Sequence, residues 1–193
     1  MRREARVGLM GGAALLVVGV AAAAGLLVWH VRFRRPPPVN GELAFATVER
    51  ARSAGAASRF FARAEPGLLV LTSRQDVAGA QPYIRKTGLD GLRALNWDEH
   101  FAIVVFRGYQ AETVPAFEIV RIVRRDADVR IYASTGFIDE EDIPTSPYHI
   151  VAVRKVGQWQ GPLTFRLFLD TAGEVAQIVK EVPESSVPLW PGR

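Results

Sequence analysis

The stretch Phe101-Ala102-Ile103-Val104-Val105-Phe106 decides the fold of this chain, because six successive apolar residues leave no polar face. A strand with one face in solvent alternates apolar and polar residues, whereas a strand covered on both faces carries an unbroken apolar run. The stretch therefore predicts a central strand. We expect its odd-numbered side chains to point to one covered face and its even-numbered side chains to the other.

Further strands are predicted on both sides of this run. Residues 124–128 form a charged turn between two apolar segments, which indicates a hairpin with its tip in solvent. Residues 163–169 alternate apolar and polar side chains, and a turn at 170–173 leads into a last strand. The predicted strands besides the central one cover residues 68–72, 117–123, 129–133, 148–156, 163–169 and 175–182.

Helical content is predicted to be small. The sequence Ser73-Arg74-Gln75-Asp76 resembles a capping box that opens a short helix, which Pro82 would end. Leu89, Leu92 and Leu95 share one face of a second helix. These patterns predict an α+β fold with a mainly antiparallel sheet and one or two short helices that cover one face of the sheet.

Residues 7–31 predict a single transmembrane helix ahead of this domain. The run is 25 residues long and has no charged side chain. At 1.5 Å per residue it would reach about 37 Å, which is enough to cross a bilayer core of about 30 Å. Arginines flank it on both sides, at Arg2, Arg3 and Arg6 and at Arg32, Arg34 and Arg35.

A cleavable signal peptide is the alternative for this run, because residues 21–24 are four alanines of the kind that a signal peptidase accepts. The apolar run continues past them to Trp29, which favours an anchor that is retained. The charges on the two sides are nearly balanced and do not decide the orientation. The chain has no cysteine, which excludes disulfides, thiolate metal sites and a lipoprotein anchor.

The basic character of the chain belongs to its N-terminal region. Residues 40–193 carry 18 basic and 19 acidic residues, so that the domain is almost neutral. We therefore exclude nucleic acid as a partner. The sequence divides into a basic N-terminus (1–6), the transmembrane helix (7–31), a proline-rich linker (32–41), a domain (42–184) and a flexible tail (185–193).

Few residues suggest chemistry. His100 and His149 could meet on adjacent strands and bind zinc, although two ordinary sheet histidines explain the pattern more simply. The acidic run Asp139-Glu140-Glu141-Asp142 could offer oxygen ligands to calcium, but it lacks the alternating ligand spacing of a known calcium loop. We predict no catalytic residue, no metal and no cofactor.

Three segments resemble the PrcB C-terminal domain family, which is named for a subunit of a surface protease complex. The resemblance rests on residues 100–108, which end in Gly108, on Phe117-Glu118-Ile119, and on Ser146-Pro147-Tyr148-His149-Ile150-Val151. It covers residues 99–156. The glycine-rich turn that is common in the family is absent after Gly108.

The resemblance implies a non-catalytic module outside the cytoplasm that binds or stabilises a partner protein, such as a protease. Ser146, Pro147, Tyr148, His149 and Gly108 are then the candidate structural or interaction residues. Two other functions stay open: a metal-dependent hydrolase that uses His100 and His149, and a sensor with a ligand cleft near residues 108–116.

Overall fold

The computed structural model describes residues 40–52, 65–110, 117–135, 146–157, 159, 161–170 and 172–183. They belong to the compact unit Pro38–Arg193. The strands and helices of this part are β1 (Gly41–Glu42), β2 (Phe45–Ala51), β3 (Gly67–Leu71), α2 (Asp76–Ala80), α3 (Lys86–Ala94), β4 (His100–Phe106), β5 (Phe117–Arg125), β6 (Asp128–Thr135), β7 (Tyr148–Arg154), β8 (Pro162–Leu169) and β9 (Gly173–Glu181).

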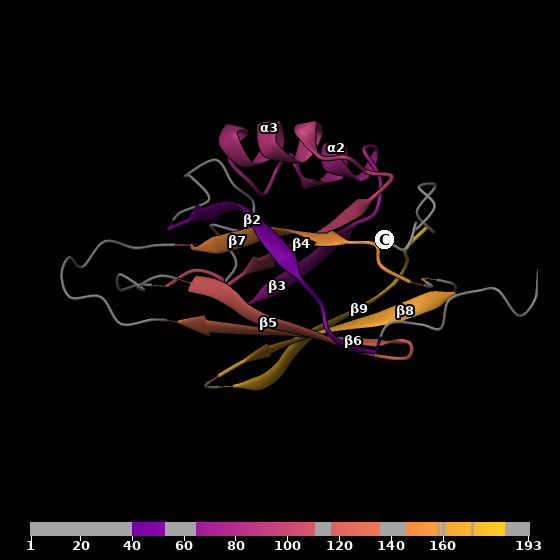
Figure 1. The fold of residues 1–193 in the computed structure, drawn as a ribbon. Helices are drawn as coiled ribbons and strands as arrows, with labels where there is room; N and C mark the ends of the chain where they lie inside the picture. Colours follow the sequence, from indigo (N-terminus) through magenta and orange to yellow (C-terminus); the bar gives the residue numbers. More distant parts are fainter. Residues whose placement is uncertain are drawn as a thin grey trace, which may run out of the picture. The chain divides into compact units, whose positions relative to one another are not determined.

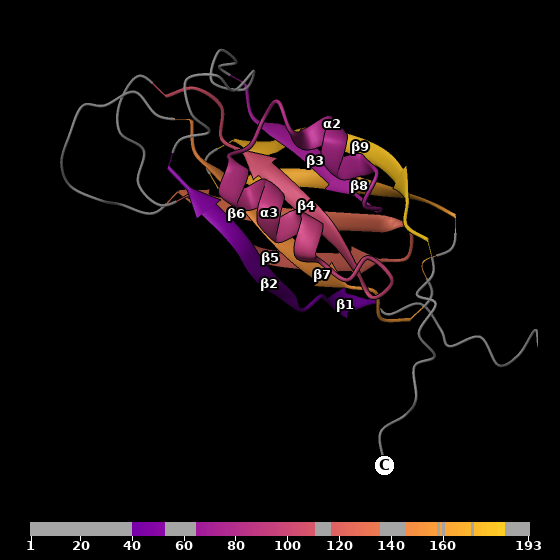
Figure 2. The ribbon, with the colours of Figure 1, turned by 90° about the horizontal axis from the view of Figure 1, so that it is seen from above.

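The strands form two sheets that pack face to face. The five-stranded sheet has the order β1-β5-β6-β8-β9, and the four-stranded sheet has the order β2-β7-β4-β3. Both helices lie on the outer side of the four-stranded sheet (Figure 1). Seen from above, α2 and α3 run across β3, β4 and β7 (Figure 2). The domain therefore has three layers: helices, four-stranded sheet and five-stranded sheet.

Strand β4 is the centre of this arrangement and confirms the prediction from its apolar run. Phe101, Ile103 and Val105 lie in the core between the two sheets. Ala102, Val104 and Phe106 lie in the second core, between the four-stranded sheet and the helices. All six side chains from Phe101 to Phe106 are fully buried. Strand β7 pairs with β4 along its whole length, as the expectation of a shared sheet requires.

Helix α3 approaches the sheet closely because two of its residues have no side chain. A Cβ atom at Gly88 would lie 2.8 Å from Cδ1 of Ile150, and one at Gly91 would lie 2.6 Å from Cγ1 of Val48. Real Cβ atoms do not come this close to other heavy atoms. A side chain at either position would require the helix or the side chains of β2 and β7 beneath it to shift.

The α+β class and the mainly antiparallel pairing are confirmed, but the layering differs from the expectation. The sequence predicted one sheet covered by helices, whereas the helices cover only one of two sheets. In addition, β6 and β8 pair in parallel. The chain leaves the five-stranded sheet after β6, passes through β7 in the other sheet, and returns at β8 in the same direction.

The β5–β6 hairpin corrects another expectation. Its turn lies at Asp126 and Ala127, as predicted, yet Arg124 is only 3% exposed. The Arg124 guanidinium carbon lies 4.3 Å from the centre of the Trp159 ring, and Nε donates a hydrogen bond to the carbonyl oxygen of Asp126. Burial lowers the pKa of Arg124. The predicted solvent-exposed arginine is thus part of the core at this end of the domain.

Several predictions concern residues outside the described part of the chain. They include the apolar run 7–31, the acidic run 139–142, the C-terminal tail and most of the loop at 108–116. Within the described ranges, no helix has the length and hydropathy needed to cross a bilayer.

Candidate functional site

The motif at residues 146–149 is buried, and it joins the two sheets and helix α3. Ser146, Tyr148 and His149 are almost completely inaccessible to solvent. The carbonyl oxygen of Pro147 accepts a hydrogen bond of 3.0 Å from the backbone N–H of Arg107. Next to it, Gly108 has a φ of 86°, in the left-handed region that favours glycine. The structure therefore brings the candidate residues together inside the fold and not on its surface.

Tyr148 ties β7 to the start of α3. Its hydroxyl donates a hydrogen bond to Glu49 and accepts one of 3.0 Å from the backbone N–H of Arg85, which precedes the first turn of the helix. The Thr87 hydroxyl also donates to Glu49. Burial and the neighbouring Glu49 carboxylate raise the pKa of Tyr148. The tyrosine is thus a hydrogen-bonded core residue that stays protonated.

His149 connects the two sheets through both of its ring nitrogens. Nδ1 accepts a hydrogen bond of 2.8 Å from the backbone N–H of Ile119 in the five-stranded sheet. Nε2 lies 3.0 Å from the Thr47 hydroxyl oxygen in β2. Because Nδ1 accepts, the proton of the neutral ring is on Nε2. Burial, together with the charge of Arg50, lowers the pKa of His149 to about 4, so that the ring is neutral at pH 7.

The backbone N–H of Ile119 explains why an imidazole is needed at position 149. Strand β1 pairs with β5 only at Val123 and Arg124, so that no described strand pairs with the backbone of β5 around Ile119 on that side. A buried N–H without an acceptor costs about 1–3 kcal/mol. The ring of His149 supplies that acceptor.

The alternative in which His100 and His149 meet and bind zinc does not fit the strand register. In the β4–β7 ladder His100 lies opposite Arg154, whereas His149 lies opposite Val105, near the other end of the strands. In an antiparallel pair, two residues near the starts of their strands are far apart. Among the described residues, no group of three histidine, aspartate or glutamate side chains could hold a metal ion.

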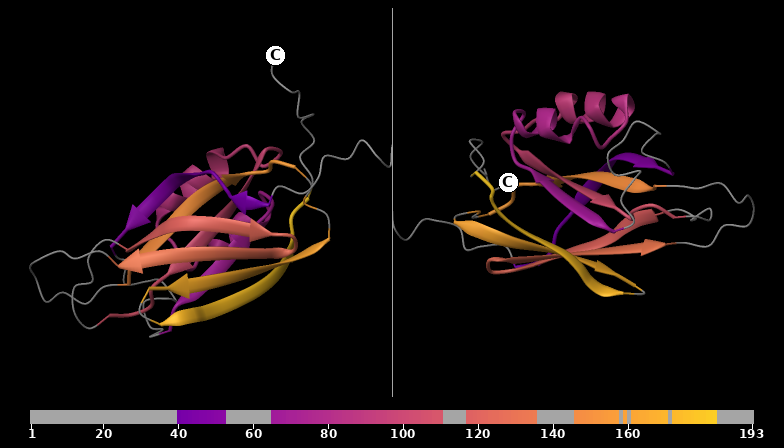
Figure 3. Two further views of the ribbon diagram at one scale, coloured as in Figure 1. Left: turned by 60° about the horizontal axis from the view of Figure 1, so that its bottom comes forward. Right: turned by 180° about the vertical axis from the view of Figure 1, so that it is seen from behind.

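The outer face of the five-stranded sheet is a candidate site that the sequence did not predict. No described helix or strand covers this face (Figure 3). We call it the outer sheet face and define it by partly or fully exposed side chains of β5, β6, β8 and β9 that alternate with more deeply buried ones: Arg121, Asp128, Arg130, Tyr132, Thr164, Arg166, Phe168, Glu174, Gln177 and Val179.

A stacked row crosses the middle of the outer sheet face. Arg121, Tyr132 and Phe168 are neighbours in the register of β5, β6 and β8. The Arg121 guanidinium carbon lies 4.5 Å from the centre of the Tyr132 ring, and the Tyr132 and Phe168 rings stack with centres 5.3 Å apart. The row offers flat, partly exposed apolar area whose side chains are held in place by one another.

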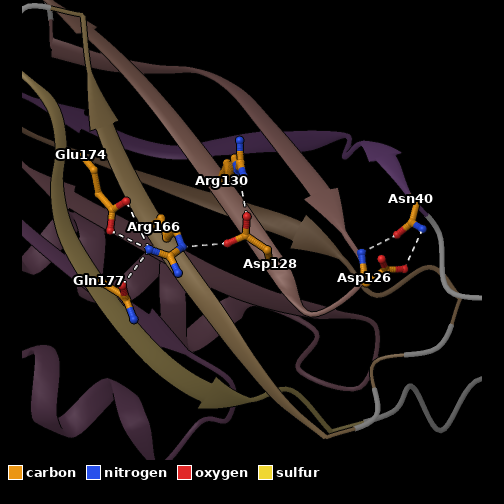
Figure 4. Close-up of polar contacts among 7 residues, drawn as sticks. All are labelled: Asn40, Asp126, Asp128, Arg130, Arg166, Glu174 and Gln177. Carbon is orange, nitrogen blue, oxygen red and sulfur yellow. Dashed lines mark hydrogen bonds and ion pairs between the residues drawn. The ribbon is translucent and has the colours of Figure 1, made fainter.

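Figure 4 shows a network of ion pairs on the outer sheet face. Asp128 accepts hydrogen bonds from Nε of Arg130 at 2.7 Å and from Nε of Arg166 at 3.0 Å. Nη1 of Arg166 also donates to Glu174, at 3.0 Å, and to Gln177, at 2.9 Å. Such exposed pairs contribute little to stability, but together they hold both arginines in defined orientations. The alternation of residues 163–169 could have indicated this face.

Comparison of the chain with protein-family models, curated proteins and solved structures finds no match. The resemblance to the PrcB C-terminal domain family therefore stays a prediction.

Proposed function

We propose that this chain is a non-catalytic interaction module, anchored in the cell membrane by residues 7–31, with its domain outside the cytoplasm, and that it binds a partner protein through the outer sheet face. The stacked row of Arg121, Tyr132 and Phe168 is the observation that carries this proposal. The family resemblance implies the class of partner, which is a protease or another subunit of a surface protease complex.

The chemistry of the outer sheet face supports a protein partner. Aromatic and arginine side chains are enriched at protein interfaces, where they supply most of the binding free energy. The stacked row has this composition, and it is bordered by charges of both signs in Asp128, Arg166 and Glu174. A partner with apolar side chains at its centre and mixed charges around them fits such a surface. Because Tyr132 is already stacked on Phe168, little side-chain entropy would be lost on binding.

The positions of the histidines favour binding over hydrolysis. Both ring nitrogens of His149 are used by Ile119 and Thr47, and the ring is buried. His100 lies toward the other end of the β4–β7 pair. A hydrolase that depends on both residues would need them at one site. This argument supports a module that acts by binding.

Site-specific photocross-linking of the full chain in its native membrane tests the proposal. A photoreactive phenylalanine analogue at position 132 should give one dominant protein adduct, which mass spectrometry would identify. The same analogue at Arg93, an exposed residue of α3, is the control and should give none. The Phe168→Ala variant should reduce the adduct at position 132 several-fold without changing the melting temperature by more than a few degrees. A partner cross-linked from position 93 and not from position 132 would refute the assignment of the face.

Topology needs its own experiment. Protease added to spheroplasts should digest residues 41–193 if the domain lies outside the cytoplasm. Protection in intact spheroplasts, followed by digestion after lysis, would place the domain on the cytoplasmic side.

A further inference from the structure

We propose that the partner protein presents an acidic side chain to Arg121 and an apolar side chain to Phe168. This inference rests on the proposed function, because it takes the outer sheet face as the binding surface. It adds the chemistry that the partner must carry at that surface, and it assigns the selection of the acidic side chain to Arg121.

The charges in the middle of the outer sheet face neutralise one another. Arg130 and Arg166 are directly opposite each other in the register of β6 and β8. Like charges in such positions repel. Asp128 pairs with both arginines, and Glu174 pairs with Arg166 (Figure 4). The two arginines are thus balanced by two carboxylates, and this network offers no net charge to a partner.

Arg121 differs from these two arginines. It is exposed, and in the described part of the chain no ion pair includes it. Its guanidinium carbon lies 4.5 Å from the centre of the Tyr132 ring, a contact that attracts the cation without using its N–H groups as hydrogen-bond donors. A guanidinium presents these donors in a planar fork, which matches a carboxylate with two parallel hydrogen bonds. Arg121 is therefore held against Tyr132 with donors that no described carboxylate occupies.

The side of the outer sheet face along β5 has an excess of positive charge. Glu118, which precedes Arg121 in the strand, is paired with Arg50. Strand β1 brings Glu42 beside β5, but Glu42 forms no ion pair with a described residue. Arg125 is a second exposed arginine of β5, and it too has no ion pair within the described ranges. Two unpaired arginines beside one unpaired carboxylate leave this side positive, which favours an acidic partner.

Phe168 supplies the apolar half of the site. Its ring is partly exposed and stacks on Tyr132, with the ring centres 5.3 Å apart. Arg121 and Phe168 lie on β5 and β8, two strands apart in the sheet, which is roughly 10 Å. A partner segment that fits both must carry a carboxylate and an apolar side chain with this separation. The apolar contact would also exclude water from the ion pair with Arg121, and ion pairs are stronger where water is excluded.

Co-purification with the partner identified at position 132 tests this inference in the full chain. The probe is the protein that mass spectrometry identifies in the photocross-linked adduct, together with the peptide to which position 132 is joined. Arg121→Glu should recover this protein at least about tenfold less than the natural chain does, because the substitution brings two like charges together. Arg121→Lys keeps the charge but loses the planar fork, and recovery should fall several-fold.

Arg93→Glu is the matched control, because it makes the same change of charge at an exposed residue of α3 and should leave the recovery unchanged. Both Arg121 variants should keep the melting temperature of the natural chain within a few degrees, since the side chain is exposed. Lysine in place of the acidic residue of the cross-linked peptide should restore the recovery with Arg121→Glu and reduce it with the natural chain.

The acidic contact and the outer sheet face can fail separately. The acidic contact is overturned if the partner from position 132 binds Arg121→Glu as well as it binds the natural chain. It is also overturned if no exchange of an acidic residue in the cross-linked peptide restores binding to Arg121→Glu. In both cases the outer sheet face remains the binding surface. If position 132 gives no adduct, the outer sheet face is refuted, and the contact with Arg121 is refuted with it.

Discussion

Acidification should destabilise the domain through His149. The neutral ring is held by Thr47 and by the N–H of Ile119, and Arg50 lies close enough to disfavour a positive charge. Arg50 itself is paired with Glu118. A proton on Nδ1 would remove the acceptor for Ile119 and would place an unpaired charge in the core. His149 therefore binds a proton less readily in the folded state than in the unfolded chain.

The pKa values set the size of the effect. His149 has a pKa of about 4 in the folded state, against 6.5 for an ordinary histidine. Stability is lost as the pH falls below 6.5, because from there on the unfolded state binds more protons, and the loss levels off near the folded-state pKa. Each unit of pKa difference corresponds to about 1.4 kcal/mol, so roughly 2.5 kcal/mol should disappear between about pH 7.5 and 4.5.

Urea denaturation of the full chain in a mild detergent, followed by tryptophan fluorescence, measures this loss. Carboxylates also titrate in this range. The quantity to compare is therefore the difference in the free energy of unfolding between the natural chain and His149→Asn at each pH. That difference should shrink by roughly 2.5 kcal/mol from about pH 7.5 to 4.5. His100→Asn, which leaves the contacts of His149 in place, is the matched control. An equal slope in both variants would refute the buried neutral histidine.

Three further predictions concern helix α3, the hydroxyl of Tyr148 and the N-terminal apolar run. Gly88→Ala should destabilise the domain by roughly 1–3 kcal/mol in urea, because the added Cβ would meet the Glu49 carboxylate and Cδ1 of Ile150. Gly79→Ala, with open space around its Cβ, should cost nothing, and equal effects would contradict the close approach of α3. Tyr148→Phe should lower the free energy of unfolding by about 1–3 kcal/mol, since the Arg85 N–H and the Glu49 carboxylate lose a hydrogen-bond partner. An unchanged melting temperature would contradict this role of the hydroxyl. N-terminal sequencing of the mature protein should find residues upstream of Ala24, and a mature terminus at Gly25 would contradict a retained anchor.

The sequence predicted strands β3 to β9 because burial leaves a direct mark on them, but it did not predict β1 and β2. The unbroken run at 101–106 and the alternation at 163–169 each follow from which faces of a strand are covered. The arrangement of those strands leaves no such mark. The apolar and polar pattern of a strand is the same whether its neighbour is parallel or antiparallel. The parallel pairing of β6 with β8 and the division into two sheets could therefore not be derived from residue patterns.

The roles of single residues were harder to predict than the elements. Arg124 looked like a turn residue because charged neighbours follow it, yet the ring of Trp159, distant in sequence, makes its burial feasible. His149 looked like a possible ligand, but its partners come from β2 and β5. In both cases the deciding contact joins residues far apart in the chain, which no local pattern encodes.

The place of β2 in the four-stranded sheet governs the order in which the domain can fold. Among the described strands it pairs only with β7, and the contact between Thr47 and His149 spans 102 residues. Because synthesis begins at the N-terminus, β2 has no partner strand until most of the domain, including β7, has been synthesised. Loop closure over such distances is entropically costly and slows folding. If the domain is exported, as we propose, β2 would still lack its partner strand during export, and the apolar strands would need protection from aggregation until folding is complete.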